Sequence, residues 1–104
     1  METFTCAYAL EMDTPLGKRR GSLTLHLLEK ALSGELTLFT RTTPIREGQR
    51  SGSDFTFRGE IKMLVGALPC EVCGTLRENG LEMEIRTARG RYPCRGVLTE
   101  KRRD

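Results

Sequence analysis

Residues 55–63, which read Phe-Thr-Phe-Arg-Gly-Glu-Ile-Lys-Met, alternate between apolar and polar positions. Phe55, Phe57, Ile61 and Met63 share one face with a glycine, and Thr, Arg, Glu and Lys share the other. Successive side chains of a β-strand point to opposite faces of a sheet, so this period of two predicts a strand with one buried and one solvated face. This stretch carries the clearest structural signal in the chain, and it indicates β-structure.

The same alternation recurs along the rest of the chain. The further predicted strands are Phe4–Met12, Leu23–Leu27, Leu36–Leu38, Leu68–Leu76, Leu81–Ile85 and Tyr92–Leu98, with a weaker one at Pro44–Arg50. Only residues 23–32 offer the i, i+3, i+4 apolar spacing of a helix, and that segment is short and contains Ser, Thr and His. The sequence therefore predicts an all-β domain of eight strands.

The connections between these strands favour a closed barrel. Compact turns at 29–31, 51–53 and 78–80 interleave with looser loops at 13–21, 41–43, 64–67 and 88–91. Alternate connections of an up-and-down meander lie at the same end, so we expect the four looser loops to share one rim. An even strand number lets the first and last strands pair antiparallel, which removes the sheet edges. We predict an eight-stranded antiparallel up-and-down β-barrel, with a two-sheet β-sandwich as the alternative.

Composition sets limits on size and location. The 104 residues are enough for a single domain, residues 1–104, and an apolar fraction of 38% is sufficient to build its core. No run approaches the roughly 18 consecutive apolar residues of a membrane span, and residues 1–12 lack the pattern of a signal peptide. The net charge of +3 is modest. We expect a cytoplasmic protein without a membrane partner.

Short turn signatures give the chain a resemblance to a known group. Asp-Thr-Pro-Leu-Gly at 13–17 is followed by Gly-Ser-Leu-Thr-Leu at 21–25, and a Gly-x-x-Pro hairpin signature occurs at Gly66–Pro69 and again at Gly90–Pro93. This pattern resembles small bacterial β-repeat domains of uncharacterised function, whose overall shape is lipocalin-like or calycin-like. The chain has no tryptophan, so the Gly-x-Trp signature of lipocalins is absent. The resemblance implies a barrel fold and brings no activity with it.

Four cysteines raise the question of metal or redox chemistry. Cys70-x-x-Cys73 has the spacing of metal and dithiol sites, but residues three apart on a strand face opposite sides. By parity Cys6, Cys70 and Cys94 point inward and Cys73 points outward. Reduced cysteine commonly packs as a small buried hydrophobe, so we expect free thiols and no cofactor. A soft-metal or redox site at the three inward thiols is the alternative.

The sequence offers no catalytic constellation. The single histidine, His26, falls on the outward face of its predicted strand, and no nucleophile and carboxylate can be assigned to it. Glu82 and Glu84 also lie on an outer face, where charge keeps a sheet soluble. We therefore expect a protein without enzymatic activity.

The looser rim carries the candidate ligand site. Its basic residues, together with an aromatic neighbour in the last strand, are Lys18, Arg19, Arg20, Arg41, Arg89, Arg91 and Tyr92. Such a collar is suited to hold a carboxylate or phosphate head group while an apolar tail enters the barrel. The large inward Leu, Phe and Met side chains favour a filled interior over a wide cavity.

Three hypotheses about function follow. The first is a module that binds a small, partly apolar or anionic ligand at the barrel mouth. The second is a structural or interaction domain that forms a homodimer through an outer face with Leu28, Phe39 and Val97. The third is the thiol-based site. Nucleic acid is not an expected partner, because most aromatic side chains have inward parity and do not stand among basic residues on the surface.

Overall fold

The computed structural model describes residues 3–64 and 66–104, and within them it contains strands and turns but no helix. The strands of this part of the chain are β1 (Phe4–Thr14), β2 (Gly17–Leu27), β3 (Leu32–Leu38), β4 (Arg41–Pro44), β5 (Arg46–Ser51), β6 (Asp54–Lys62), β7 (Ala67–Arg77), β8 (Gly80–Thr87) and β9 (Gly90–Arg103). They form one sheet in which every neighbouring pair is antiparallel. The predicted all-β class is confirmed, and the chain does not form the two-sheet sandwich.

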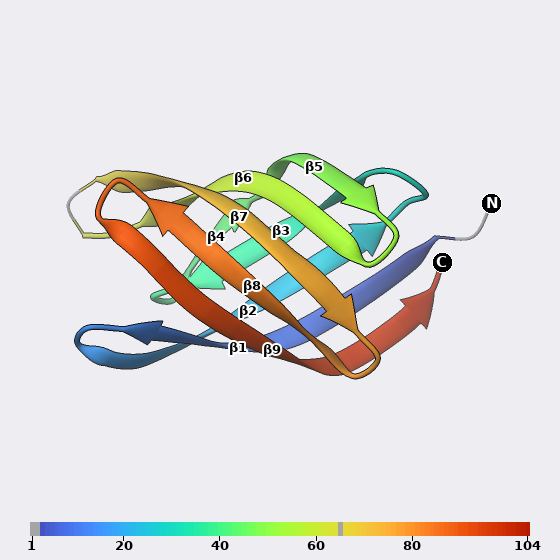
Figure 1. Ribbon diagram of the computed structural model, residues 1–104, viewed down its shortest axis with the longest axis horizontal. Coiled ribbons are helices and arrows are strands. Elements are labelled where there is room, and N and C mark those ends of the chain that lie inside the picture. The colour runs from blue at the N-terminus through green and yellow to red at the C-terminus, as the bar shows by residue number, and fades with distance from the viewer. Residues whose placement is uncertain (1–2, 65) are drawn as a thin grey trace.

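The sheet curls until its two edges approach each other, with β5 beside β3 and β4 beside β6 (Figure 1). The strand order is β4-β3-β2-β1-β9-β8-β7-β6-β5, so the first and last strands pair with each other and β4 and β5 are the edges. The result is a nearly closed barrel that measures 41 × 23 × 20 Å. We call the two ends of the barrel the hairpin end, where β1–β2, β3–β4, β6–β7 and β8–β9 are connected, and the terminal end, where both chain termini lie (Figure 1).

The chain forms nine strands, not eight, because the weak strand predicted at Pro44–Arg50 divides into two. β4 pairs with β3, ending with Glu35 opposite Pro44, whereas β5 pairs with β6. The change of partner falls at Ile45, whose side chain is buried and whose amide donates to the Gly34 carbonyl at 3.0 Å. An alternating pattern reports which face is buried and does not report which neighbour is paired. β4 and β5 run in the same direction, so β1 still meets β9 antiparallel.

Backbone contacts between β3 and β5 close the barrel along a line that we call the seam, formed by residues 30–34 and 45–50. The Arg50 amide donates to the Lys30 carbonyl at 3.0 Å. Ala31 and Gln49, the neighbours of these two residues, form an isolated antiparallel bridge. These bonds satisfy backbone groups that an open sheet edge leaves exposed.

Gly48 lies at the tightest point of the seam. A Cβ atom at this position falls 2.0 Å from the carbonyl oxygen of Leu32, so only a hydrogen fits there. The preceding Glu47 has a φ of 52°, and β5 carries one residue more than β6 at this point. Such a β-bulge bends its strand, and here it accompanies the turn of β5 toward β3.

Two hairpins at the hairpin end share a Thr-x-x-Gly construction. The Thr14 hydroxyl donates to the Gly17 carbonyl at 2.6 Å, and the Thr87 hydroxyl donates to the Gly90 carbonyl at 3.2 Å. Each hydroxyl also accepts the amide two residues further on. These bonds make two-residue turns, so the longer loops predicted around them are wrong.

The loop predicted at Arg41–Thr43 is also wrong, because these residues belong to β4 and the turn lies earlier. Phe39 and Thr40 form it with φ angles of 53° and 63°, the left-handed conformation of a type I′ hairpin turn. Glycine and asparagine suit these positions, whereas a bulky or β-branched residue costs on the order of 1 kcal/mol or more. The sequence carries no Asn-Gly signal here, so the turn is not predicted.

The inward side of the strands fills the barrel, as the predicted alternation requires. The buried hydrophobic side chains are Cys6, Tyr8, Leu10, Met12, Leu23, Leu25, Leu27, Leu32, Leu36, Leu38, Ile45, Phe55, Phe57, Ile61, Cys70, Val72, Leu81, Met83, Ile85 and Cys94. The rings of Phe55 and Phe57 stack with their centroids 6.1 Å apart. Most of the interior is therefore packed core.

Gly48→Ala is expected to lower the free energy of unfolding by about 3 kcal/mol, because the new methyl group overlaps the Leu32 carbonyl. Gly59→Ala is the matched control in a neighbouring strand. Its Cβ meets no atom closer than 3.9 Å, so the substitution should be neutral or add about 0.5 kcal/mol by restricting the unfolded chain. Urea unfolding followed by circular dichroism measures both, and equal losses would contradict the seam.

Candidate functional site at the terminal mouth of the barrel

The basic residues predicted to form a collar all lie at the hairpin end, but they do not converge on the barrel interior. Lys18 and Arg20 face outward, and Lys18 is paired with Glu11 at 3.0 Å. Arg19 and Tyr92 have inward parity and are half-buried. The remaining members, Arg41, Arg89 and Arg91, are exposed.

The interior beneath this collar is occupied by core side chains. Met12, Leu38 and Cys94 are each only 2% exposed and lie in inward positions close to the hairpin end. An apolar tail entering from this side meets packed side chains. The predicted head-group collar therefore has a filled barrel below it.

A cavity of about 340 Å³ opens instead at the terminal end. It is lined by the first and last inward residues of several strands and by polar residues of the adjoining turns: Phe4, Cys6, Tyr8, Leu27, Arg50, Ser53, Leu76, Arg77, Glu78, Leu98 and Lys101. The inward members come from β1, β2, β7 and β9, so this cavity is a mouth of the barrel itself.

Tyr8 and Cys6 line the deep part of this mouth. Both belong to the inward face of β1, and their side chains are 5% and 2% exposed. Burial raises the pKa of the Tyr8 hydroxyl well above its usual 10.0, and the neighbouring Cys6 thiol adds to the rise, while the Arg50 guanidinium opposes it. The phenol therefore stays protonated at neutral pH and can donate a hydrogen bond.

Two cations at the rim are held by contacts that leave their charge uncompensated. The Arg50 guanidinium donates to the Gly52 and Leu28 carbonyls at 3.0 and 3.1 Å, which fixes it between two turns. The Lys101 ammonium lies 5.1 Å from the centre of the Phe4 ring. A cation over an aromatic face is attracted to the ring while keeping its full charge. Apolar walls and fixed positive charge thus meet at one opening.

The other charges at this mouth are more nearly balanced. Arg77 donates to the Glu82 carboxylate at 2.9 Å, on the outer side of the wall. Glu78 is the acidic residue among those that line the cavity. With Arg77 paired, Arg50 and Lys101 outnumber the single carboxylate, so the opening favours an anion.

The sequence does not indicate this cavity, for two reasons. Arg50 belongs to the weakly predicted segment, and Lys101 lies beyond the predicted last strand, which ends at Leu98, whereas β9 continues to Arg103. The inward parity of Phe4, Cys6 and Tyr8 was correctly predicted, and parity does not reveal which end of a barrel stays open. The sequence signal that points to this end is the run of inward positions Phe4, Cys6 and Tyr8 at the start of β1.

The inward cysteines do not gather into one site. Within residues 3–64 and 66–104 no cluster of three or more Cys, His, Asp or Glu side chains has the geometry of a metal site, and all four thiols are free. Cys94 lies on the strand next to Cys6, but antiparallel pairing places it opposite Met12, six residues further along β1. Burial, with a smaller contribution from the Asp13 carboxylate, raises the pKa of the Cys94 thiol from 9.0 to about 12.

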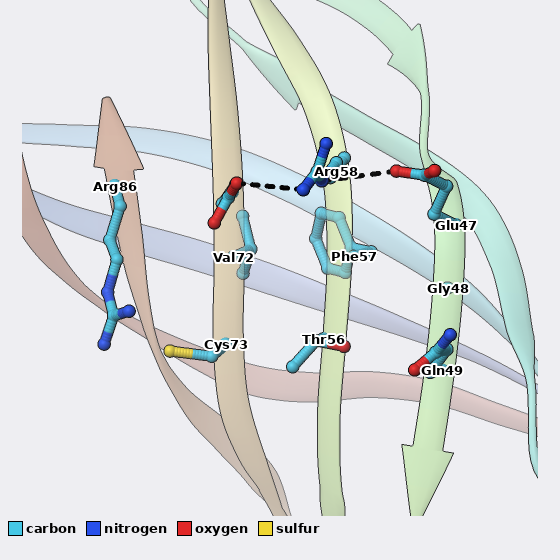
Figure 2. A pocket seen from close by; sticks show the side chains of 10 residues that line it. Glu47, Gly48, Gln49, Thr56, Phe57, Arg58, Val72, Cys73 and Arg86 are labelled. Carbon is cyan, nitrogen blue, oxygen red and sulfur yellow. Dashed lines mark ion pairs between the residues drawn. The ribbon is translucent and has the colours of Figure 1, made fainter. Parts of the chain in front are cut away.

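A groove of about 560 Å³ on the outer wall is a less suitable site, because its charges are compensated. Figure 2 shows Arg58 between carboxylates on the two neighbouring strands. Its guanidinium pairs with Glu47 at 3.2 Å and with Glu71 at 3.3 Å, and Arg86 pairs with Glu84 at 2.7 Å. Little net attraction remains for a charged ligand.

The residues suggested for a dimer face are also dispersed. Leu28 follows β2 at the terminal end, Phe39 follows β3 at the hairpin end, and Val97 lies on the outer wall in β9. These three side chains therefore belong to separate surfaces.

Comparison with known proteins gives no relative for this chain: no protein family, curated protein or solved structure matches it. No helix of the described residues has the length and apolar character of a membrane span. The barrel shape agrees with the fold that the turn signatures imply.

The buried thiol predicts how stability depends on pH. The pKa of the Cys94 thiol is raised in the folded state, so its contribution to the free energy of unfolding is constant below pH 9. That contribution is lost as the pH rises toward 12. Between pH 8 and pH 10.5 this group alone should remove about 2 kcal/mol from the free energy of unfolding. Urea unfolding at both pH values tests this expectation. Cys94→Ala should show a smaller pH difference, and an equal one would contradict the assignment to this thiol.

Proposed function

We propose that the protein is a non-enzymatic binding module for a small, partly apolar anion held in the mouth at the terminal end. The observation that carries the proposal is the cavity in which apolar side chains and two uncompensated cations, Arg50 and Lys101, face one opening. Four free cysteines suit a reducing compartment, and we propose a cytoplasmic location on that basis.

The chemistry of the mouth favours a ligand with one anionic group and a short apolar body. Phe4, Leu27 and Leu98 offer apolar walls, and the carboxylate or phosphate remains at the rim within reach of the two cations. The protonated Tyr8 hydroxyl adds a neutral hydrogen-bond donor deeper in the cavity. Specificity in such a pocket comes from a few polar groups placed among apolar walls.

The size of the cavity limits the ligand. A volume of about 340 Å³ lies near the lower end of the roughly 300–1,000 Å³ typical of small-molecule pockets. The packed core directly behind it stops a long chain from passing through the barrel. A medium-chain carboxylate is a suitable first probe.

Self-association is the second candidate, and a groove on the outer wall favours it. Ala9 and Val97, which lie opposite each other on β1 and β9, line this groove together with Arg20 and Arg95, and Val97 is 65% exposed. An exposed apolar patch bordered by charge is a common feature of contact surfaces between proteins. Sedimentation of the wild-type protein and of Val97→Asp distinguishes the two candidates, since ligand binding at the mouth does not need a dimer.

Binding is tested with the fluorescent apolar anion 8-anilinonaphthalene-1-sulfonate, displaced by decanoate. Lys101→Gln should weaken the binding of the fluorescent anion and of decanoate by about fivefold each, the effect of losing one charged contact of roughly 1 kcal/mol. Leu98→Trp should reduce binding further, because the larger side chain fills part of the cavity at the terminal end. Lys30→Gln, an exposed lysine outside the mouth, is the matched control and should bind like the wild type.

An unchanged affinity in both Lys101→Gln and Leu98→Trp would place the probe elsewhere and reject the proposed site. A parallel titration of Arg89→Gln examines the hairpin end. Weaker binding by Arg89→Gln, with unchanged binding by Lys101→Gln, would favour the basic collar predicted from the sequence as the ligand site.

A further inference from the structure

Three large apolar side chains project from the loops of the hairpin end. Leu16 in the β1–β2 turn is 84% exposed, Leu64 between β6 and β7 is 91% exposed, and Phe39 in the β3–β4 turn is 39% exposed. They come from three different connections that the meander brings to one end (Figure 1). Scattered exposed leucines are ordinary on a surface, but these tips stand together at the extremity of an elongated molecule.

The turn that carries Phe39 is unfavourable for its own residues. Phe39 and Thr40 both occupy left-handed backbone positions, which glycine or asparagine fills at lower cost. A strained turn residue is a sign that the side chain has a use beyond folding. Here the strain presents an aromatic ring at the tip of the hairpin.

Charge is strongly polarised toward the same end. Its connections and the strand residues beside them, positions 13–19, 39–42, 62–67 and 87–91, contain six of the 17 basic residues and one of the 14 acidic residues. This end therefore carries +5, and the eleven basic and 13 acidic residues elsewhere carry −2. Within the described part of the chain, Lys18 is the one basic residue of this set that has an ion-pair partner.

We propose that the hairpin end docks on an anionic lipid surface. Lys62, Arg41, Arg89 and Arg91 face the negative head groups, while the apolar tips enter the boundary between head groups and acyl chains. Basic residues near such a surface and apolar side chains that enter it are the two contributions that hold peripheral proteins on membranes. Aliphatic tips suit acyl chains, whereas a single-stranded nucleic acid requires aromatic platforms for its bases.

This inference departs from the expectation that the protein has no membrane partner. That expectation rested on the missing apolar span and the missing signal-peptide pattern, and neither feature shows where charges and loop tips lie. The docking surface is at the opposite end of the barrel from the proposed ligand mouth, so each proposal can be rejected without affecting the other.

Vesicle sedimentation at low ionic strength tests the proposal. The full chain should bind phosphatidylcholine vesicles that contain phosphatidylserine, fail to bind pure phosphatidylcholine vesicles, and be released by salt. The double variant Arg89→Gln, Arg91→Gln should bind about 25-fold more weakly, at roughly fivefold for each cation. Leu16→Ser and Leu64→Ser should each bind about tenfold more weakly.

Matched controls separate docking from general effects of charge or stability. Leu28→Ser and Lys30→Gln, both exposed and near the terminal end, should bind like the wild type. Phe39→Asn should raise the unfolding midpoint, by relieving the turn, and yet weaken vesicle binding. Thr40→Gly relieves the same turn without removing the tip, so it should stabilise the protein and leave binding unchanged.

Three results would overturn the proposal. They are the absence of wild-type binding to phosphatidylserine vesicles at low salt, equal binding to neutral vesicles, and equal weakening by Leu28→Ser and Leu64→Ser. Preference for a single-stranded oligonucleotide, unaffected by Leu16→Ser, would also reject a lipid surface in favour of nucleic acid.

Discussion

The change of strand partner at Ile45 is the constraint on which the rest of the barrel depends. The eleven residues 41–51 pair first with β3, as β4, and then with β6, as β5. Residues of β5 also lie against β3 across the seam. A closed sheet needs this crossing to bring two backbones very close, and Gly48 is the residue that permits it. Without the seam, β4 and β5 are open edges and the core is exposed along one side.

The seam also positions the candidate site. The backbone of Arg50 completes the seam at Lys30, and its guanidinium reaches across to Leu28 and Gly52. One residue thus links the closing of the barrel to the charge at the terminal mouth. At the hairpin end, short Thr-x-x-Gly turns and packed side chains seal the interior and leave the loop tips and their basic neighbours facing outward. The two ends therefore differ in chemistry although they belong to one sheet.

The alternating pattern predicted the class of fold and the inward face of nearly every strand, because burial of one face is a local property of each strand. It did not predict the division at Ile45, because pairing partners are decided by backbone geometry that side-chain polarity does not encode. The turn chemistry of Thr14 and Thr87 was readable as Thr-x-x-Gly, yet the Thr, Pro and Gly content of these segments suggested looser loops. The loop composition directed the predicted site to the hairpin end, since composition does not show whether the barrel below is filled.

Amide hydrogen exchange of Arg50 and Ile45 tests this account most directly. Their amides donate across the seam to Lys30 and Gly34, so they should exchange only through opening with a free energy close to that of global unfolding. Protection should be comparable to that of core amides in β1. Exchange at the rate of a solvent-exposed edge strand would contradict the closed seam and, with it, the placement of Arg50 at the mouth.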